Sequence, residues 1–152
     1  MTLDDLIAER TITRALTLIA RAMDDRDWAA LDDLTVPDMT ANLGTGELGS
    51  RAEMVASIRS FLDACGPTQH LLGNVVVDVG GDTATSRAYV SDLHLGTGDR
   101  SGVTFQTLGD YHDSWVRQGE AWLLTRRVKL GRGHVGSFTV LGPGPDGWSP
   151  RG

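Results

Sequence analysis

Three residues of this chain carry side chains suited to proton transfer near neutral pH: Asp24, His70 and His112. A carboxylate and two imidazoles are the groups that proteins most often use as general acids and bases. All three fall in segments with apolar neighbours rather than in long polar loops. The leading hypothesis is therefore a small acid-base site, and the elements that position these residues decide whether they meet.

Asp24 lies at the end of an amphipathic helix that we expect from about residue 3 to residue 24. Thr2 and Asp5 have the spacing of a capping box, and apolar residues then recur every three or four positions along one stripe. The helix dipole disfavours an anion at this end, so a buried Asp24 needs a partner, which a protonated His70 would supply. The alternative is that Asp24 caps the helical turn or faces water.

Two further helices are expected before the strands begin. Residues 27–31 resemble a short helix that cannot extend past Pro37, and Ser50 with Glu53 predicts the start of a third helix that ends near Leu62. The glycine-rich segment 38–49 suits a loop near the mouth of a pocket.

Antiparallel strands are expected after residue 67, over about 75–79, 83–95, 104–117 and 121–130, with glycine-containing turns between them. Helices first and strands afterwards indicate an α+β fold, with three N-terminal helices on the concave face of one curved, mostly antiparallel sheet. We expect a domain over residues 1–135 and a Gly/Pro-rich tail over 136–152, extended or poorly ordered.

The inward face of the third expected strand stays open at this stage. His112 alternates with Leu108, Asp110, Ser114 and Val116, whereas Tyr111, Asp113 and Trp115 lie on the opposite face. If the first set faces the helices, His112 and Asp110 enter the pocket; if the second does, they are solvated. His94 and His134 are expected at the surface, and the basic residues of 126–132 at a solvated strand edge.

Composition excludes several classes of function. The formal charge of -6 argues against nucleic acid as a partner, since phosphate binding depends on concentrated Lys and Arg. No apolar run is long enough to span a bilayer, so we expect a cytoplasmic protein without a membrane partner. Cys65 is the only cysteine, which excludes an intrachain disulfide. The four histidines show no paired spacing, so no metal site is expected.

Three strings of this sequence give it a resemblance to a known family. They are Met23-Asp24-Asp25-Arg26-Asp27-Trp28-Ala29-Ala30-Leu31, Thr68-Gln69-His70-Leu71-Leu72-Gly73-Asn74 and Tyr111-His112-Asp113-Ser114-Trp115-Val116-Arg117. With the order of the elements, they resemble the SnoaL-like branch of the nuclear transport factor 2-like superfamily, which includes polyketide cyclases, scytalone dehydratase and bile-acid dehydratases. The resemblance covers about residues 3–130 and implies a cone-shaped α+β barrel.

The resemblance also implies roles for individual residues. Asp24 and His70 match an acid-base couple in which the carboxylate holds the imidazole. A tyrosine expected before the aspartate is Met23 here, and a histidine expected on the strand after the Gly80-Gly81 turn falls near Ala88, so scytalone dehydration itself is not expected. His112 would replace part of the missing equipment. The candidate substrate-binding residues are Tyr89, Trp28, Leu108, Asp110 and Met23.

The sequence thus predicts a cofactor-independent lyase, cyclase or isomerase acting on a small apolar oxygenated molecule such as a polyketide, steroid or terpenoid intermediate. His70 would be the base, Asp24 its orienting partner, and His112 or Tyr89 the donor to a developing enolate oxygen. The alternative is a non-catalytic ligand-binding or assembly module. Either way, a curved sheet with one uncovered face suggests a homodimer or homotrimer.

Overall fold

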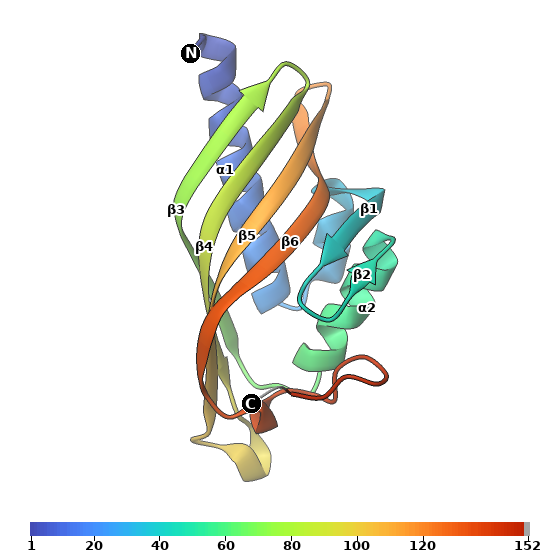
Figure 1. Ribbon diagram of the computed structural model, residues 1–152, viewed down its shortest axis with the longest axis vertical. Helices are drawn as coiled ribbons and strands as arrows, with labels where there is room; N and C mark the ends of the chain where they lie inside the picture. The colour runs from blue at the N-terminus through green and yellow to red at the C-terminus, as the bar shows by residue number, and fades with distance from the viewer. Residues whose placement is uncertain (151–152) are drawn as a thin grey trace.

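The computed structural model describes residues 1–150, and its helices lie where the capping signals predict them (Figure 1). Helix α1 spans Leu3–Asp24, with a complete capping box between Thr2 and Asp5. The 3₁₀ helix η1 spans Trp28–Asp33, and helix α2 spans Arg51–Leu62 after its N-cap Ser50. Within the described residues, no helix is both long and apolar enough to cross a membrane.

Six strands form one open, mostly antiparallel sheet in the order β2-β1-β6-β5-β4-β3. Their bounds are β1 Thr35–Asn42, β2 Glu47–Leu48, β3 Thr68–Gly80, β4 Thr83–Leu95, β5 Thr104–Gln118 and β6 Ala121–Gly136. Among the strand pairs of residues 1–150, only β1 and β6 are parallel. The expected loop at 38–49 contains most of β1 and all of β2. The remaining strands follow the predicted order: β4 has the predicted bounds, and β3, β5 and β6 extend further. The predicted α+β cone is confirmed.

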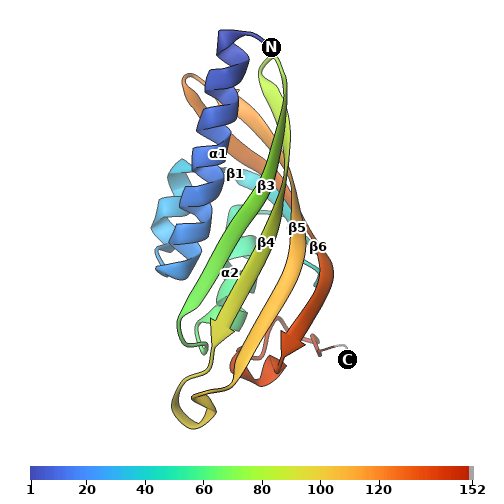
Figure 2. The ribbon, with the colours of Figure 1, turned by 90° about the vertical axis from the view of Figure 1, so that its left-hand side faces the viewer.

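The helices cover the concave side of the sheet (Figure 2). Helix α1 packs mainly on β3, and α2 packs next to β1. The core between these layers includes Ile12, Leu16 and Ile19 from α1, and Trp115 and Leu124 from the sheet, each at most 1% exposed. Because of this packing, the ends of α1 and α2 face the halves of β3 to β6 that lie lower in Figure 1, and a cavity opens between them.

Two β-bulges decide which side chains of β3 and β6 face the helices. In β3, Gly73 pairs with Tyr89 but Val76 pairs with Arg87, so one extra residue is inserted near Asn74. In β6, Leu124 pairs with Trp115 but Arg126 pairs with Ser114, so one extra residue is inserted and the next inward position is Arg127 rather than Arg126. A bulge reverses the alternation of side chains along a strand. One set of alternate residues therefore faces the helices before the bulge, and the other set faces them after it.

The expectation of a solvated basic edge in β6 is therefore wrong for its inward-facing residues. Arg127 is only 3% exposed and forms a two-pronged ion pair with Asp113, with N–O distances of 2.8 and 2.9 Å. Lys129 also faces the helices, while Arg126 pairs with Glu47 and Arg132 with Asp110 at exposed positions.

The tail is irregular, but it packs against α2 instead of projecting from the domain. A short 3₁₀ helix, η3, spans Phe138–Val140. The backbone N–H of Gly142 then donates to the Phe61 carbonyl at 2.7 Å, and the Trp148 ring meets the Phe61 ring edge-on at a centroid distance of 4.9 Å. Residues 151 and 152, the end of the predicted tail, lie outside the described residues.

Candidate active site

Asp24 and His70 lie in direct contact, although 46 residues separate them in the chain. Nδ1 of His70 is 2.6 Å from Oδ1 of Asp24, and the backbone N–H of His70 donates to Oδ2 at 2.9 Å. The last turn of α1 supplies the carboxylate, and the first residues of β3 supply the imidazole. Since the carboxylate accepts the Nδ1 proton, Nε2 is the nitrogen that is free to exchange a proton with a ligand.

Asp24 is held as an ionised hydrogen-bond acceptor. Burial alone would raise its pKa, but hydrogen bonds from the side chain and backbone of His70 and from Thr68 lower the pKa of this carboxyl below its ordinary value. The Thr68 hydroxyl donates to Oδ1 at 2.9 Å. The carboxylate thus accepts three hydrogen bonds, from the Thr68 hydroxyl and from the backbone and ring of His70, which fix its position relative to the imidazole.

A second carboxylate stands on the other side of the imidazole. Oδ2 of Asp92 is 3.7 Å from Nε2 of His70 and 2.7 Å from Nζ of Lys129, and Thr107 donates to Oδ1. Burial tends to raise the pKa of Asp92, yet Lys129 and His70 lower it overall. Burial tends to lower the pKa of Lys129, but its interactions with Tyr111 and with the Asp92 carboxylate raise it overall. This ion pair was not predicted from the sequence.

His94 lies beside His70 inside the molecule, so its predicted surface position is wrong. It is 5% exposed, and its ring centroid is 6.0 Å from that of His70. Nδ1 is 3.1 Å from the carbonyl oxygen of Phe105, and because a carbonyl only accepts, Nδ1 carries the proton. Burial lowers the pKa of His94, so the neutral ring presents an unprotonated Nε2.

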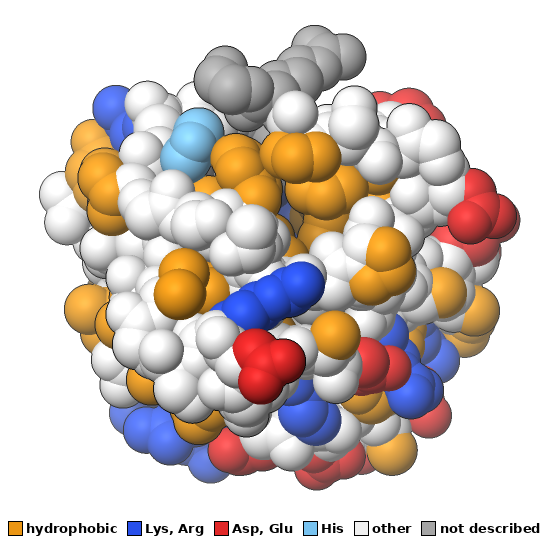
Figure 3. Space-filling model, turned by 90° about the horizontal axis from the view of Figure 1, so that it is seen from below, with side chains coloured by type: hydrophobic (Ala, Val, Ile, Leu, Met, Phe, Trp, Pro, Cys, Tyr) orange, Lys and Arg blue, Asp and Glu red, His pale blue; other side chains and the backbone are white. Residues whose placement is uncertain are grey.

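These groups line a cavity of about 240 Å³ between the helices and the sheet. Seen from the lower end of the molecule, hydrophobic side chains gather around a hollow in the surface (Figure 3). The helix side and the tail contribute mostly apolar side chains, and β3 to β6 contribute the titratable ones. The apolar lining includes Ile19, Met23, Leu31, Met54, Ile58, Phe61, Leu62, Phe138, Leu141 and Trp148. The polar lining includes His70, Asp92, His94, Thr107, Tyr111, Arg127 and Lys129.

The sequence did not decide whether Tyr111 or His112 of β5 faces the helices, and in the structure Tyr111 does. Its ring lies under the Arg127 guanidinium at 3.9 Å, and burial raises the pKa of its hydroxyl, which stays protonated near neutral pH. Tyr111 alternates with Asp113 and Trp115, so this set faces the helices. The cavity therefore contains a neutral phenol as a potential hydrogen-bond donor.

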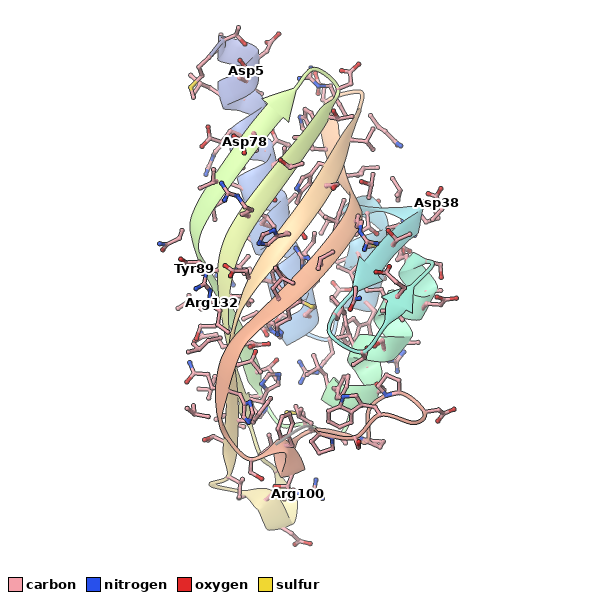
Figure 4. The ribbon with its side chains drawn as sticks, in the orientation of Figure 1. Asp5, Asp38, Asp78, Tyr89, Arg100 and Arg132 are labelled. Atoms are coloured by element: carbon pink, nitrogen blue, oxygen red, sulfur yellow. The ribbon has the colours of Figure 1, made fainter. Side chains whose placement is uncertain are left out.

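Four predicted site residues lie outside the cavity. His112 and Leu108 are exposed on the convex face of the sheet, and Asp110 pairs there with Arg132 at 2.7 Å. Tyr89 is 46% exposed, and Figure 4 labels it next to Arg132, whose guanidinium lies 4.7 Å from the ring. We therefore remove these four residues from the candidate site, because the side chains that alternate with them along β4 and β5 are the ones that face the helices.

The other two predicted substrate-binding residues lie on the helix side. Met23 lines the cavity, whereas Trp28 packs against the core and is absent from the cavity lining. The sequence of β4 does contain a signal for Asp92 and His94, the two site residues on this strand that were not predicted. Its buried row Ala84, Ser86, Ala88 and Val90 continues in the same alternation to Asp92 and His94, which identifies both as inward-facing.

His70, Asp92 and His94 form the one His/Asp group in residues 1–150 with spacing suited to a metal ion, their ligand atoms lying within 4.8 Å of one another. Both imidazoles have their Nδ1 engaged, which suits Nε2 ligation. However, the Lys129 ammonium occupies the cation position at Asp92, 2.7 Å from Oδ2. A divalent ion would have to displace or repel this ammonium, so the donor set fits a metal poorly.

The fold and this site define an α+β cone of the nuclear transport factor 2-like type with a histidine-carboxylate couple inside. Residues 4–128 match the family model of the SnoaL-like domain, and the chain belongs to this family. It is 32% identical over 120 residues to Rv2910c, an uncharacterized protein of Mycobacterium tuberculosis, covering 78% of this chain and 81% of that protein. An uncharacterized protein of Mycobacterium bovis, Mb2934c, matches equally well.

Solved structures show the same fold at low sequence identity. One is assigned as a scytalone dehydratase from Novosphingobium aromaticivorans, with 22% identity and a TM-score of 0.78 over 99% of this chain and 100% of that chain. Another is hexachlorocyclohexane dehydrochlorinase LinA-type3 from Novosphingobium barchaimii, with 14% identity and a TM-score of 0.77 over 89% and 93% of the two chains. The resemblance to the SnoaL-like branch is confirmed.

Proposed function

We propose that this protein is a cofactor-independent acid-base enzyme, a dehydratase, cyclase or isomerase, that acts on a small, neutral, largely apolar oxygenated molecule. The observation that carries the proposal is the 2.6 Å contact between His70 Nδ1 and Asp24 Oδ1 at the wall of an apolar cavity. A neutral imidazole oriented by a carboxylate is suited to removing a proton next to a carbonyl group. This step is common to the three reaction types.

The residues of the cavity divide the chemistry between them. His70 takes the proton at Nε2, and Asp24 keeps the Nδ1 proton in place and stabilises the imidazolium that forms. Lys129 and Tyr111 replace His112 and Tyr89 as candidate donors to the developing enolate oxygen, because both line the cavity on the sheet side. The names of the two solved relatives, a dehydratase and a dehydrochlorinase, describe eliminations, which supports this class of chemistry.

The charge and the volume of the cavity limit the kinds of substrate that it can bind. The lining cations Arg127 and Lys129 are each paired with a buried carboxylate, Asp113 and Asp92, so the two pairs carry no net charge, which favours a neutral ligand over an anionic one. An apolar cavity of about 150 Å³ binds benzene. The larger volume here, about 240 Å³, suits a molecule of one or two rings. Among the predicted classes, we therefore favour a small polyketide or terpenoid intermediate over a steroid.

The alternative, a non-catalytic module, predicts a cavity that holds a ligand without reaction, a cavity filled by side chains, or Asp24 and His70 lying apart. The hydrogen-bonded couple and the open apolar cavity both favour the enzyme. The expected homodimer or homotrimer stays a prediction.

A deuterium-exchange experiment tests the proposal. One- and two-ring ketones and hydroxyketones are incubated with the protein in D₂O, and loss of the C–H signal next to the carbonyl is followed by NMR. Wild-type protein should accelerate exchange for a subset of the panel, and His70→Ala and Asp24→Asn should each reduce the rate by about 10²–10⁴-fold with nearly unchanged thermal unfolding.

The matched control is His112→Ala, which removes an exposed imidazole from the convex face and should leave exchange unchanged. Full exchange activity in both site variants would contradict the proposal. Saturable binding of panel members in the cavity without exchange of any hydrogen would instead identify a binding module.

A further inference from the structure

Arg26 connects the acid-base couple to the ends of both helices. One guanidinium nitrogen, Nη1, donates to the Thr68 hydroxyl oxygen at 2.8 Å and to the Met23 carbonyl at 2.8 Å. The other, Nη2, donates to the Gly66 carbonyl at 3.1 Å. The side chain therefore ties the last turn of α1 to the segment that leads into β3, the two elements that carry Asp24 and His70.

These contacts fix the direction of one hydroxyl proton. A guanidinium has donors only, so at the Arg26 contact the Thr68 oxygen must be the acceptor. Its single proton is then free for the remaining partner, Oδ1 of Asp24, at 2.9 Å. The same oxygen, Oδ1, lies 2.6 Å from Nδ1 of His70. A continuous chain of donors thus runs from Arg26 through Thr68 to the carboxylate.

The backbone at Arg26 gives an independent reason to expect a role for its side chain. Its φ is +56°, and Arg26 and Asn74 are the only non-glycine residues with positive φ within residues 1–150. The hydrogen bonds Arg26 N–H to Met23 O and Asp27 N–H to Ala22 O form a helix-terminating motif in which glycine is the preferred residue at this position. An arginine in a conformation that favours glycine indicates that the guanidinium is needed.

We propose that Arg26 is a positioning residue: by orienting the Thr68 hydroxyl, it holds Asp24 as a hydrogen-bond acceptor facing His70. The inference rests on the proposed function, because it concerns the same couple. Arg26 lies outside the cavity lining and acts through Thr68 and Asp24.

The test compares Arg26→Gly with variants of its partner. Arg26→Gly suits the backbone conformation and removes the whole side chain, guanidinium included, so its effect reports on the side chain and not on backbone strain. The primary measurement is ¹⁵N-edited NMR of His70, which records the Nδ1–H signal and its exchange with water without any substrate. We expect Arg26→Gly and Thr68→Val each to accelerate this exchange about fivefold or more, and Thr68→Ser, which keeps the hydroxyl, to resemble wild type.

Two controls separate positioning from a general loss of stability. Arg51→Met removes another arginine that donates to a threonine hydroxyl, Thr35, at 2.7 Å, but far from Asp24 in the hydrogen-bond network, and should leave the His70 signal unchanged. In the double variant Arg26→Gly/Thr68→Val, the effects should not add, because both residues act through one contact.

Unchanged Nδ1–H exchange in Arg26→Gly, additive effects in the double variant, or an equal effect of Arg51→Met would each overturn the inference. The proposed function fails separately, through the deuterium exchange of ketones by the Asp24 and His70 variants. The His70 NMR signal still tests the positioning in that case, because it needs no turnover.

Discussion

The buried ion pair between Lys129 and Asp92 provides the most quantitative test of the site. The two side chains are 18% and 4% exposed, and their charged atoms lie 2.7 Å apart. At an effective dielectric constant of about 20, the attraction at this distance is about 6 kcal/mol before desolvation is subtracted. Removing one partner of such a buried pair costs about 3–5 kcal/mol, since the other charge is left uncompensated. We expect Lys129→Met to destabilise the protein by about 3 kcal/mol at pH 8.

The pH dependence of this loss identifies its cause. In the wild type, Lys129 helps to hold the pKa of Asp92 below its ordinary value of 3.8, so the stability that this carboxylate contributes is lost only below that pH. Without Lys129, burial should raise the folded-state pKa above the unfolded value. A raised pKa gives stability at low pH that is lost as the pH rises. The deficit of Lys129→Met should therefore shrink between pH 8 and pH 5.

Urea unfolding followed by tryptophan fluorescence at pH 5 and pH 8 measures both effects. The matched control is Arg132→Met, which breaks an ion pair of the same 2.7 Å length with Asp110 at a position 56% exposed, and which should change stability little. The double variant Lys129→Met/Asp92→Asn should recover part of the loss. An unchanged urea midpoint in Lys129→Met at both pH values, or equal losses in the control, would refute the reasoning.

Three further predictions concern the cavity and the tail. Burial lowers the pKa of His94 from 6.5, so the stability that its neutral imidazole contributes is complete above that pH and is lost as the pH falls. His94→Gln should therefore make the urea midpoint fall less between pH 7.5 and pH 5.5. Trp148→Ala should raise KM for exchanged ketones several-fold at unchanged kcat, measured from the concentration dependence of deuterium exchange, since it supplies an apolar wall and no titratable group. Gly144→Ala should lower Tm by calorimetry, because a Cβ there would lie 2.7 Å from ring atoms of Phe61 and Trp148, whereas Gly147→Ala, with a similar φ of +77° but open space, should cost less.

Local signals in the sequence predict most of the elements. The capping pair Thr2 and Asp5 gives the start of α1, and the alternation of apolar residues gives β4 and β5, because these signals depend on neighbours in the chain. The meeting of Asp24 with His70 depends instead on packing between elements 46 residues apart. The resemblance to the SnoaL-like family predicted it, and periodicity alone did not.

The polar wall of the site could not be predicted in the same way. Both faces of β5 carry an aspartate, Asp110 on one and Asp113 on the other, so alternation did not decide between His112 and Tyr111. In β6, Val128 and Leu130 follow Trp122 and Leu124 in the same period of two, but the bulge after Leu124 places Arg127 and Lys129 inward instead. A bulge is set by pairing with the neighbouring strand, which leaves little trace in the strand's own sequence.

The two buried ion pairs on the sheet side have a consequence for how a ligand must lie. Replacing such pairs by apolar residues of similar size is often neutral or stabilising, so stability alone does not explain Asp92–Lys129 and Asp113–Arg127. Fixed charges in a cavity attract the polar end of a ligand to one side, and the apolar walls of α1 and α2 accept the hydrocarbon end. Under the proposed function, the oxygen of the ligand would face Lys129, and a carbon next to it would lie toward His70, where a base must act. A ligand bound in the opposite orientation would bury its oxygen against the helices without a charged partner.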